Sequence, residues 1–301
     1  MKKILFALFA LLFGATPRLA AQTPEPFPYQ DIPLVFPNQA SEAEWYALHF
    51  WDSYNFAAPY HYDQEAFRGA FVDYVHALRE VPSEVALGAA REMMHLAAIT
   101  EESYWMQLEE AEIILYDPSS PLRNDLLWEA VMRHAIGPES PLDEVSKMRY
   151  VSMLTLTSRN QVGTRAANFT YTLPDGQWGS LHNIKAEYTL IYFYNPGCSE
   201  CKRTKQAILA SGALEHLHRQ GRLEVLAIYP DKEVDEWRRY LADNPSWWIS
   251  AYDKERRLHG EELYDLKAIP TLYLLDSQKS VLLKDPTPED LNKAIERIVK
   301  N

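Results

Sequence analysis

Between residues 41 and 160 the apolar side chains recur every three or four positions, as on one face of an α-helix. The clearest example is Phe67, Phe71, Tyr74, Val75 and Leu78. Six helices are predicted, separated by turn-forming and helix-ending residues. The first is expected to start at Ser41, because Ser41 and Glu44 have the spacing of a capping box. No β-rich run interrupts these patterns, so residues 41–160 are predicted to form an all-α helical bundle.

After a predicted boundary near residues 160–164, short apolar runs alternate with helical patterns. Strands are predicted at residues 169–173, 188–194, 223–229, 272–275 and 281–284. Asp175-Gly176 is a hairpin turn signal. Helices are predicted from residue 198 to about 219, and at 233–242 and 288–299. Such alternation is typical of a central sheet covered by helices, and it defines a second domain at residues 163–301.

The first residues have the pattern of an export signal. Lys2 and Lys3 precede an apolar run at residues 4–13, and small residues at 19–21 offer a cleavage site. The alternative is a membrane-spanning helix, which needs about 20 apolar residues, whereas this run ends at Gly14. We therefore expect a signal peptide at residues 1–21, an exported or periplasmic protein, and no membrane span after cleavage. Residues 22–40 contain five prolines and are expected to form an extended lead-in.

Charge and cysteine content narrow the possible functions. The net charge of −12 argues against a nucleic-acid partner, which requires clustered cationic side chains. The 301-residue chain holds two cysteines, Cys198 and Cys201. An exported protein meets an oxidising compartment, but a disulfide across two intervening residues restricts the chain very little. The spacing therefore indicates redox chemistry rather than a structural crosslink.

The cysteine pair follows directly after a predicted buried strand. A tight turn containing Gly197 leads into a predicted helix, so that Cys198 stands at the helix start. Unpaired N–H groups and the helix dipole there favour a thiolate. Cys201 lies one turn further along the same face and would resolve a mixed disulfide formed at Cys198. Gly197 would let a substrate backbone come close. The nearby cations, which more simply form a solvated helix face, are Lys202, Arg203 and Lys205.

Residues 163–301 resemble the thioredoxin-like family, and within it the TlpA-like exported thiol-disulfide oxidoreductases. The resemblance is carried by FTYTLPDG, TLIYFYNPGCSECK and YDLKAIPTLYLLD. It implies an α/β thioredoxin-like fold and a cis peptide bond before Pro270. It also implies that Pro270, with Ile269 before it, faces the cysteine pair. Ile269 and Pro270 are therefore expected to contact the substrate together with Gly197. No cofactor is implied.

Three positions depart from the pattern of that family. Gly197 stands where the family often has Trp. Tyr192 replaces the buried acid of thioredoxins, and Thr204 replaces a Glu often found in TlpA-like proteins. A buried acid would help to move protons at Cys201, so its absence bears on rate and direction, with Glu200 or water as substitutes.

The helical half resembles an uncharacterised domain that precedes thioredoxin-like domains in exported Gram-negative proteins. The similar segments are LHFWDSYNF and LYDPSSPLRND. Residues 41–160 are accordingly expected to be a helical domain of unknown function, serving either as a structural cap or as a docking domain for partners. Docking is suggested by the aromatic residues Trp45, Tyr46, Trp51, Tyr54, Phe56, Tyr60 and Tyr62.

The histidines give no indication of a bound metal. His216 and His218 would point to different faces of one helix, and His61 with Asp63 is a weak pair near a loop. A protein-bound metal requires convergent ligands, so none is expected. The sequence also contains no Gly-rich phosphate loop and no G-x-S-x-G nucleophile elbow.

The leading hypothesis is an exported thiol-disulfide oxidoreductase of the reductase or isomerase type, contributing to cell redox homeostasis. Its partners would be protein thiols and disulfides and a reducing partner of unknown identity. One alternative is a peroxidase-type redoxin, against which Asn195 argues, because that class has Thr or Ser three residues before its reactive cysteine. The other is a non-enzymatic, redox-regulated binding module.

Overall fold

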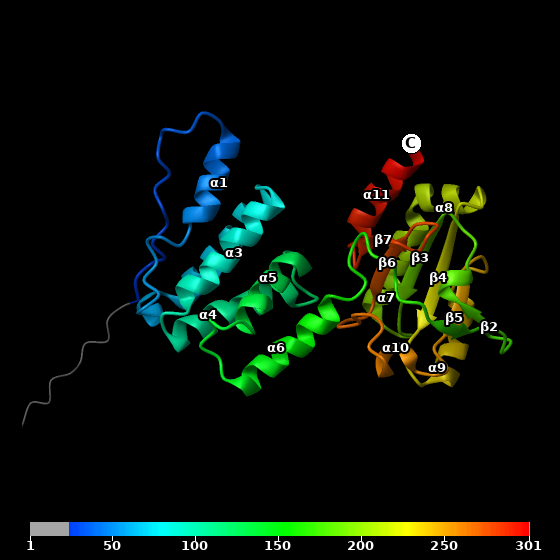
Figure 1. Ribbon diagram of the computed structural model, residues 1–301. Coiled ribbons are helices and arrows are strands. Elements are labelled where there is room, and N and C mark those ends of the chain that lie inside the picture. Colours follow the sequence, from blue (N-terminus) through cyan, green and yellow to red (C-terminus); the bar gives the residue numbers. More distant parts are fainter. Residues whose placement is uncertain (1–23, 301) are drawn as a thin grey trace, which may run out of the picture.

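Between residues 39 and 157 the chain forms six α-helices, as the apolar spacing predicts (Figure 1). The computed structural model describes residues 24–300, so the expected signal peptide lies outside the described residues. The helices are α1 (Gln39–His49), α2 (Gln64–Arg79), α3 (Ser83–Ala97), α4 (Glu101–Ala111), α5 (Asp125–Ala135) and α6 (Glu144–Thr157). A 3-10 turn, Pro59–His61, precedes α2, and a π-helical segment, Glu112–Tyr116, extends α4. Within residues 24–300 no helix has the length and apolar character needed to cross a membrane.

The start of the helical half differs from the prediction in two respects. Helix α1 begins before Ser41, because the side chain of Asn38 is the N-cap and accepts the N–H of Ser41 at 2.9 Å. The proline-rich lead-in is also more than a spacer. Glu25 pairs with Tyr62 in a β-bridge, and Phe27 is 5% exposed within the helical core. Proline spacing could not indicate that one apolar side chain anchors this segment.

The aromatic cluster of the helical half is mainly core. Trp51, Tyr54, Phe56 and Tyr62 are buried, whereas Trp45 and Tyr46 are half-buried and Tyr60 is exposed. Ring contacts such as Trp51 with Tyr54, centroids 5.5 Å apart, stabilise this interior. Core packing therefore explains most of these aromatic residues. Their abundance is no longer evidence that the helical half docks partners.

Residues 170–284 contribute seven strands to one mixed sheet in the order β2-β1-β5-β4-β3-β6-β7. The strands are β1 (Thr170–Thr172), β2 (Trp178–Ser180), β3 (Tyr188–Phe193), β4 (Leu223–Tyr229), β5 (Ile249–Tyr252), β6 (Thr271–Leu275) and β7 (Val281–Lys284). Strands β3, β4 and β5 are parallel, and β6 runs antiparallel to β3. Strand β5 was not predicted. The hairpin around Gly176, whose φ is +87°, is confirmed.

Helices cover both faces of the sheet. They are α7 (Ser199–Ala210), α8 (Gly212–Arg219), α9 (Val234–Arg239), α10 (Arg257–Gly260) and α11 (Pro288–Lys300), with 3-10 turns at Leu181–Asn183 and Leu241–Asp243. Successive residues of β3 point to opposite faces: Leu190 and Tyr192 join one core, Ile191 and Phe193 the other. The helix predicted to run to residue 219 is two helices, because Ser211 ends α7 and N-caps α8. The structure thus has the predicted architecture, a helical domain followed by a thioredoxin-like α/β domain.

The two halves lie side by side (Figure 1). Ion pairs join them. Asp125, the first residue of α5, accepts from Lys267 and Lys284 of the α/β half, each at 3.0 Å. Arg123 contacts Asp285, also at 3.0 Å. Burial opposes ionisation of Asp125, but the two lysines outweigh it and lower the pKa of this carboxyl.

Candidate active site

Cys198 lies in the turn that connects strand β3 to helix α7. The turn between them needs a left-handed backbone, and Gly197 supplies it with a φ of +75°. Gly197 is exposed, and a Cβ placed on it would meet no atom within 4 Å. The approach to Cys198 is therefore open on this side.

Cys198 is the N-cap of α7. Its Sγ accepts the backbone N–H of Cys201 at 3.1 Å, which satisfies one of the free donors at the helix start. The thiol of Cys198 also lies 3.7 Å from the carbonyl oxygen of Ile269, to which it donates. The peptide bond between Ile269 and Pro270 is cis, as the family resemblance implied. The structure therefore brings Gly197, Cys198, Cys201 and Ile269 together, with Pro270 next to Ile269 in the chain.

Cys201 differs sharply from Cys198 in environment. It is 3% exposed, whereas Cys198 is half-buried, and both are free thiols in the structure. Burial, with a further contribution from the Cys198 side chain, raises the pKa of Cys201 to about 12. The outer sulfur is thus accessible and the inner one is held protonated, an arrangement suited to sequential thiol chemistry.

Tyr192 occupies the position where thioredoxins have a buried acid. Its hydroxyl donates to the carbonyl oxygen of Cys201 at 2.7 Å, and its ring stacks on Tyr194 with centroids 5.1 Å apart. Burial raises the pKa of Tyr192 far above its usual value, so the hydroxyl keeps its proton. Tyr192 therefore fixes the first turn of α7 but offers no carboxylate to take a proton from Cys201. Thr204, another of the three departures, is buried on helix α7.

A cleft of about 580 Å³ opens beside the cysteine pair. Tyr194 lies in its wall, held by hydrogen bonds from Trp237 at 3.0 Å and Asn244 at 2.8 Å. Lys202 and Lys205 line the rim, and Lys205 donates to the carbonyl oxygen of Asp243 at 3.0 Å. Sequence reasoning missed Tyr194 and Asn244, although the Tyr192–Tyr194 alternation on a buried strand was a usable signal.

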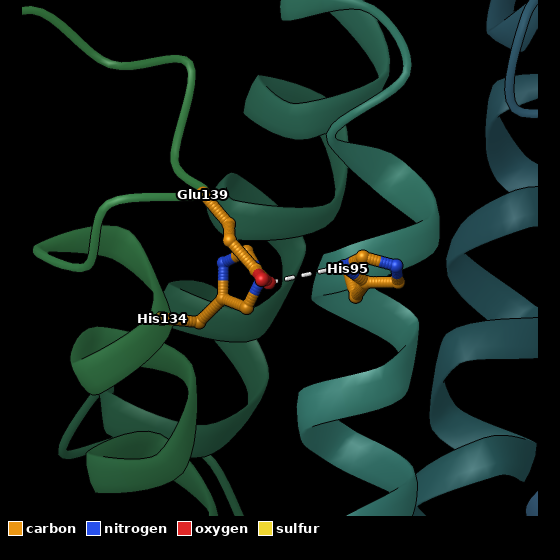
Figure 2. A group of neighbouring side chains, drawn as sticks. All are labelled: His95, His134 and Glu139. Atoms are coloured by element: carbon orange, nitrogen blue, oxygen red, sulfur yellow. Dashed lines mark hydrogen bonds and ion pairs between the residues drawn. The ribbon is translucent and has the colours of Figure 1, made fainter.

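Candidate metal ligands lie elsewhere, in the helical half. Within residues 24–300, His95, His134 and Glu139 place a ligand atom each within 4.8 Å of the others (Figure 2). Sequence spacing could not reveal this group, because the three residues belong to α3, α5 and the loop after α5.

Both halves match families of known proteins. Residues 186–281 match a family described as thioredoxin-like, and residues 14–160 match a domain of unknown function, DUF5106. Nucleoredoxins from Bos taurus and Homo sapiens are 24% identical over 119 residues, which is 39% of this chain and 27% of theirs. The chain thus spans about a quarter of the length of these curated relatives.

Two crystal structures from Bacteroides resemble this protein. A thioredoxin-like protein from Bacteroides caccae is 38% identical, with a TM-score of 0.87 over 91% of this chain and 99% of that chain. The C-terminal domain of an uncharacterised protein from Bacteroides fragilis is 45% identical, with a TM-score of 0.45 over 46% of this chain and 98% of that one. The first similarity covers the helical and α/β halves together. The chain therefore belongs to the thioredoxin-like proteins, with a DUF5106 domain preceding its thioredoxin-like domain.

Proposed function

We propose that this protein is an exported thiol-disulfide oxidoreductase of the reductase or isomerase type, acting on protein disulfides through Cys198 and Cys201. The observation that carries the proposal is the placement of the two sulfurs. Cys198 is half-buried, and its Sγ caps α7 and lies 3.7 Å from the Ile269 carbonyl oxygen, whereas Cys201 is buried. The accessible cysteine is therefore placed to attack a substrate disulfide, and the buried cysteine to resolve the mixed disulfide.

The reaction balances with the two cysteines as the electron donors. The Cys198 thiolate attacks one sulfur of a substrate disulfide; that S–S bond breaks, and the departing substrate thiolate takes up a proton. A mixed disulfide now joins Cys198 to the substrate. Cys201 loses its proton and attacks Cys198 Sγ, which releases the second substrate thiol and leaves a Cys198–Cys201 disulfide. The substrate gains two electrons and two protons, and an external dithiol must reduce the protein again.

Substrate binding would use backbone groups close to the cysteines. Gly197 is exposed and lacks a side chain, so an extended peptide could pass close to Cys198. The backbone carbonyl oxygen of Ile269 lies 3.7 Å from the sulfur of Cys198. Pairing of that backbone with an extended segment would give affinity with little demand on the substrate sequence.

Cys201 must lose its proton before it attacks. This chain has Tyr192 in place of the buried carboxyl group that would accept that proton. Glu200 is exposed, and its hydrogen bond and ion pair with Arg203 lower its pKa, so it is a poor proton acceptor. Tyr192 keeps its own proton. Water entering the cleft beside Tyr194 is then the remaining carrier, and resolution by Cys201 is expected to be the slow step.

The experiment that tests the proposal is reduction of insulin by dithiothreitol, followed by turbidity. The protein should accelerate precipitation, and both Cys198→Ser and Cys201→Ser should abolish the acceleration while retaining the thermal unfolding midpoint. A binding module would give no acceleration in any form. A peroxidase-type redoxin would instead consume hydrogen peroxide faster than it reduces insulin.

Export is tested separately, because it rests on residues 1–21. Expression in a Gram-negative host followed by fractionation and N-terminal sequencing should give a periplasmic protein that starts near residue 22. A full-length chain retained in the cytoplasm would overturn this part of the proposal and leave the thiol chemistry untouched.

A further inference from the structure

Three potential ligands converge in the helical half, at a distance in sequence from the cysteines (Figure 2). His95 stands near the end of α3, His134 near the end of α5, and Glu139 in the loop that follows α5. Glu139 Oε2 lies 3.1 Å from His95 Nδ1 and 3.9 Å from His134 Nε2. Ligands at the corners of a tetrahedron around Zn²⁺ stand roughly 3.3 Å apart, given bond lengths near 2.0–2.1 Å. The two distances from Glu139 lie on either side of that value, and all three ligand atoms lie within 4.8 Å of one another.

His134 is held in a position suited to metal binding. Its side chain is 9% exposed, and Nδ1 shares a hydrogen bond of 2.9 Å with the hydroxyl of Tyr104. In the tautomer in which Nδ1–H donates to Tyr104, Nε2 presents its lone pair toward Glu139. Nε2 is buried and has no hydrogen-bond partner among residues 24–300. Ligating histidines typically have their other ring nitrogen fixed by such a contact.

We propose that His95 Nδ1, His134 Nε2 and Glu139 Oε2 bind a late first-row divalent cation, with Zn²⁺ as the reference ion. Two imidazoles and one carboxylate form a ligand set that Zn²⁺ prefers, with a fourth position for water. His95 and Glu139 are exposed, with 57% and 65% of their side chains accessible, so an ion can enter from solvent. The bound ion would tie α3 to the loop after α5.

A simple ion pair explains the cluster less well. The contact of His95 Nδ1 with Glu139 Oε2, at 3.1 Å, accounts for only two of the three groups. His134 Nε2 lies 3.9 Å from the same carboxylate, and a cation between them would satisfy its lone pair. An unpartnered buried polar atom is costly, and a metal ligand role removes that cost.

Zinc binding to the full-length chain tests the proposal. The measurements use a Cys198→Ser/Cys201→Ser background, because thiolates also bind Zn²⁺. Isothermal titration with ZnCl₂ should show one saturable site, and Zn²⁺ should raise the thermal unfolding midpoint. His95→Gln and Glu139→Gln change exposed side chains and should each weaken binding by about 100-fold or more, with the midpoint of the metal-free protein retained. Tyr104→Phe should weaken binding by about 10-fold, as expected for a residue that orients a ligand.

The matched control is His49→Gln. His49 also pairs with a carboxylate, Asp52, at 2.7 Å, and is exposed, but it lies outside the cluster. This variant should bind Zn²⁺ as the parent does, and Co²⁺ should give the visible absorption of a four-coordinate site in both. Absence of a saturable site, or equal affinity in the His95→Gln and Glu139→Gln variants, would overturn the proposal. Neither result would bear on the thiol chemistry, because the background lacks both cysteines.

Discussion

The ammonium nitrogen of Lys267 lies 3.0 Å from the carboxylate of Asp125, across the boundary between the two halves. Lys267 is two residues before Ile269, whose carbonyl oxygen contacts Cys198. Its side chain is 7% exposed, and it also lies 4.5 Å from the ring centroid of Tyr116. The helical half therefore contacts the segment that leads to Ile269. We predict that this contact helps to position Ile269.

Asp125→Asn should destabilise the protein by about 3 kcal/mol, because breaking a buried ion pair leaves an uncompensated charge. Here two lysines, Lys267 and Lys284, would lose the same carboxylate. Chemical denaturation measures the loss. The control is Glu215→Gln, which breaks the exposed pair with Arg219 and should cost less than about 1 kcal/mol. If the two variants lose the same free energy of unfolding, the buried ion pairs stabilise the protein no more than an exposed pair does.

Alkylation of the reduced protein should label Cys198 before Cys201 throughout the range from pH 6 to pH 9. A thiol whose pKa is raised to about 12 stays protonated at any pH well below that value, and Cys201 is also 3% exposed. Iodoacetamide with peptide mass spectrometry resolves the two sites. Preferential labelling of Cys201 would reverse the proposed roles of the cysteines. Cys201→Ser should leave the labelling rate of Cys198 within about twofold, since the nucleophilic thiolate remains.

Cys201→Ser should trap mixed disulfides, and Cys198→Ser should not. Without Cys201 the intermediate at Cys198 has no internal thiol to resolve it. The buried Cys201 cannot replace Cys198 as the attacking group. Non-reducing electrophoresis with insulin as substrate distinguishes the two variants. Adducts that form equally in both would mean that either cysteine can start the reaction.

Much of the fold could be predicted because it depends on local patterns. The spacing of apolar residues predicted the six N-terminal helices. Equally clear apolar patterns predicted β3, β4 and α11. Strand β5 was missed because Ile249–Tyr252 is short, and it becomes a strand by pairing with β4 in parallel. The separation of α7 from α8 at Ser211 depends on a side-chain cap that a continuous helical pattern conceals.

The cysteine site was predictable for a similar reason and the histidine cluster was not. Cys198 and Cys201 are one helical turn apart, so their proximity follows from sequence. The contact of Cys198 with Ile269 joins distant segments of the chain. Only the family resemblance, which implied that Pro270 faces the cysteines, indicated that these segments meet. His95, His134 and Glu139 meet through the packing of α3 against α5, which no motif records.

Gly197→Ala should destabilise the protein by about 1 kcal/mol, because φ is +75° and an L-residue is strained in that region. No atom would clash with the new methyl group, so the cost is that of the backbone alone. Insulin reduction should slow more than reduction of a small aromatic disulfide, because the methyl group would face the substrate backbone. The control is Gly69→Ala on the exposed face of α2, which should stabilise by about 1 kcal/mol. Equal rates on both substrates would remove Gly197 from the proposed binding surface.

The α/β half should fold without the helical half. Their hydrophobic cores are separate: buried residues between 27 and 154 form one cluster, and those between 166 and 295 form the other two. The ion pairs of Lys267 and Lys284 with Asp125 would be lost, but both lysines would regain water, which limits the cost. A fragment of residues 160–301 is therefore expected to unfold cooperatively and to reduce insulin.

The starting residue of such a fragment decides how stable it is. The side chain of Asn160 donates to the Leu263 carbonyl oxygen at 2.8 Å and accepts the N–H of Ala167 at 2.7 Å. A fragment of residues 163–301 loses both bonds and should be less stable than residues 160–301 by about 1–3 kcal/mol. Denaturation midpoints compare the two. If neither fragment folds, the helical half is a structural cap despite its separate core. If both fold and the longer one reduces insulin at the rate of the full chain, the contact between Lys267 and Asp125 is not needed to position Ile269. If the longer fragment folds but reduces insulin more slowly than the full chain, the helical half is needed to position Ile269.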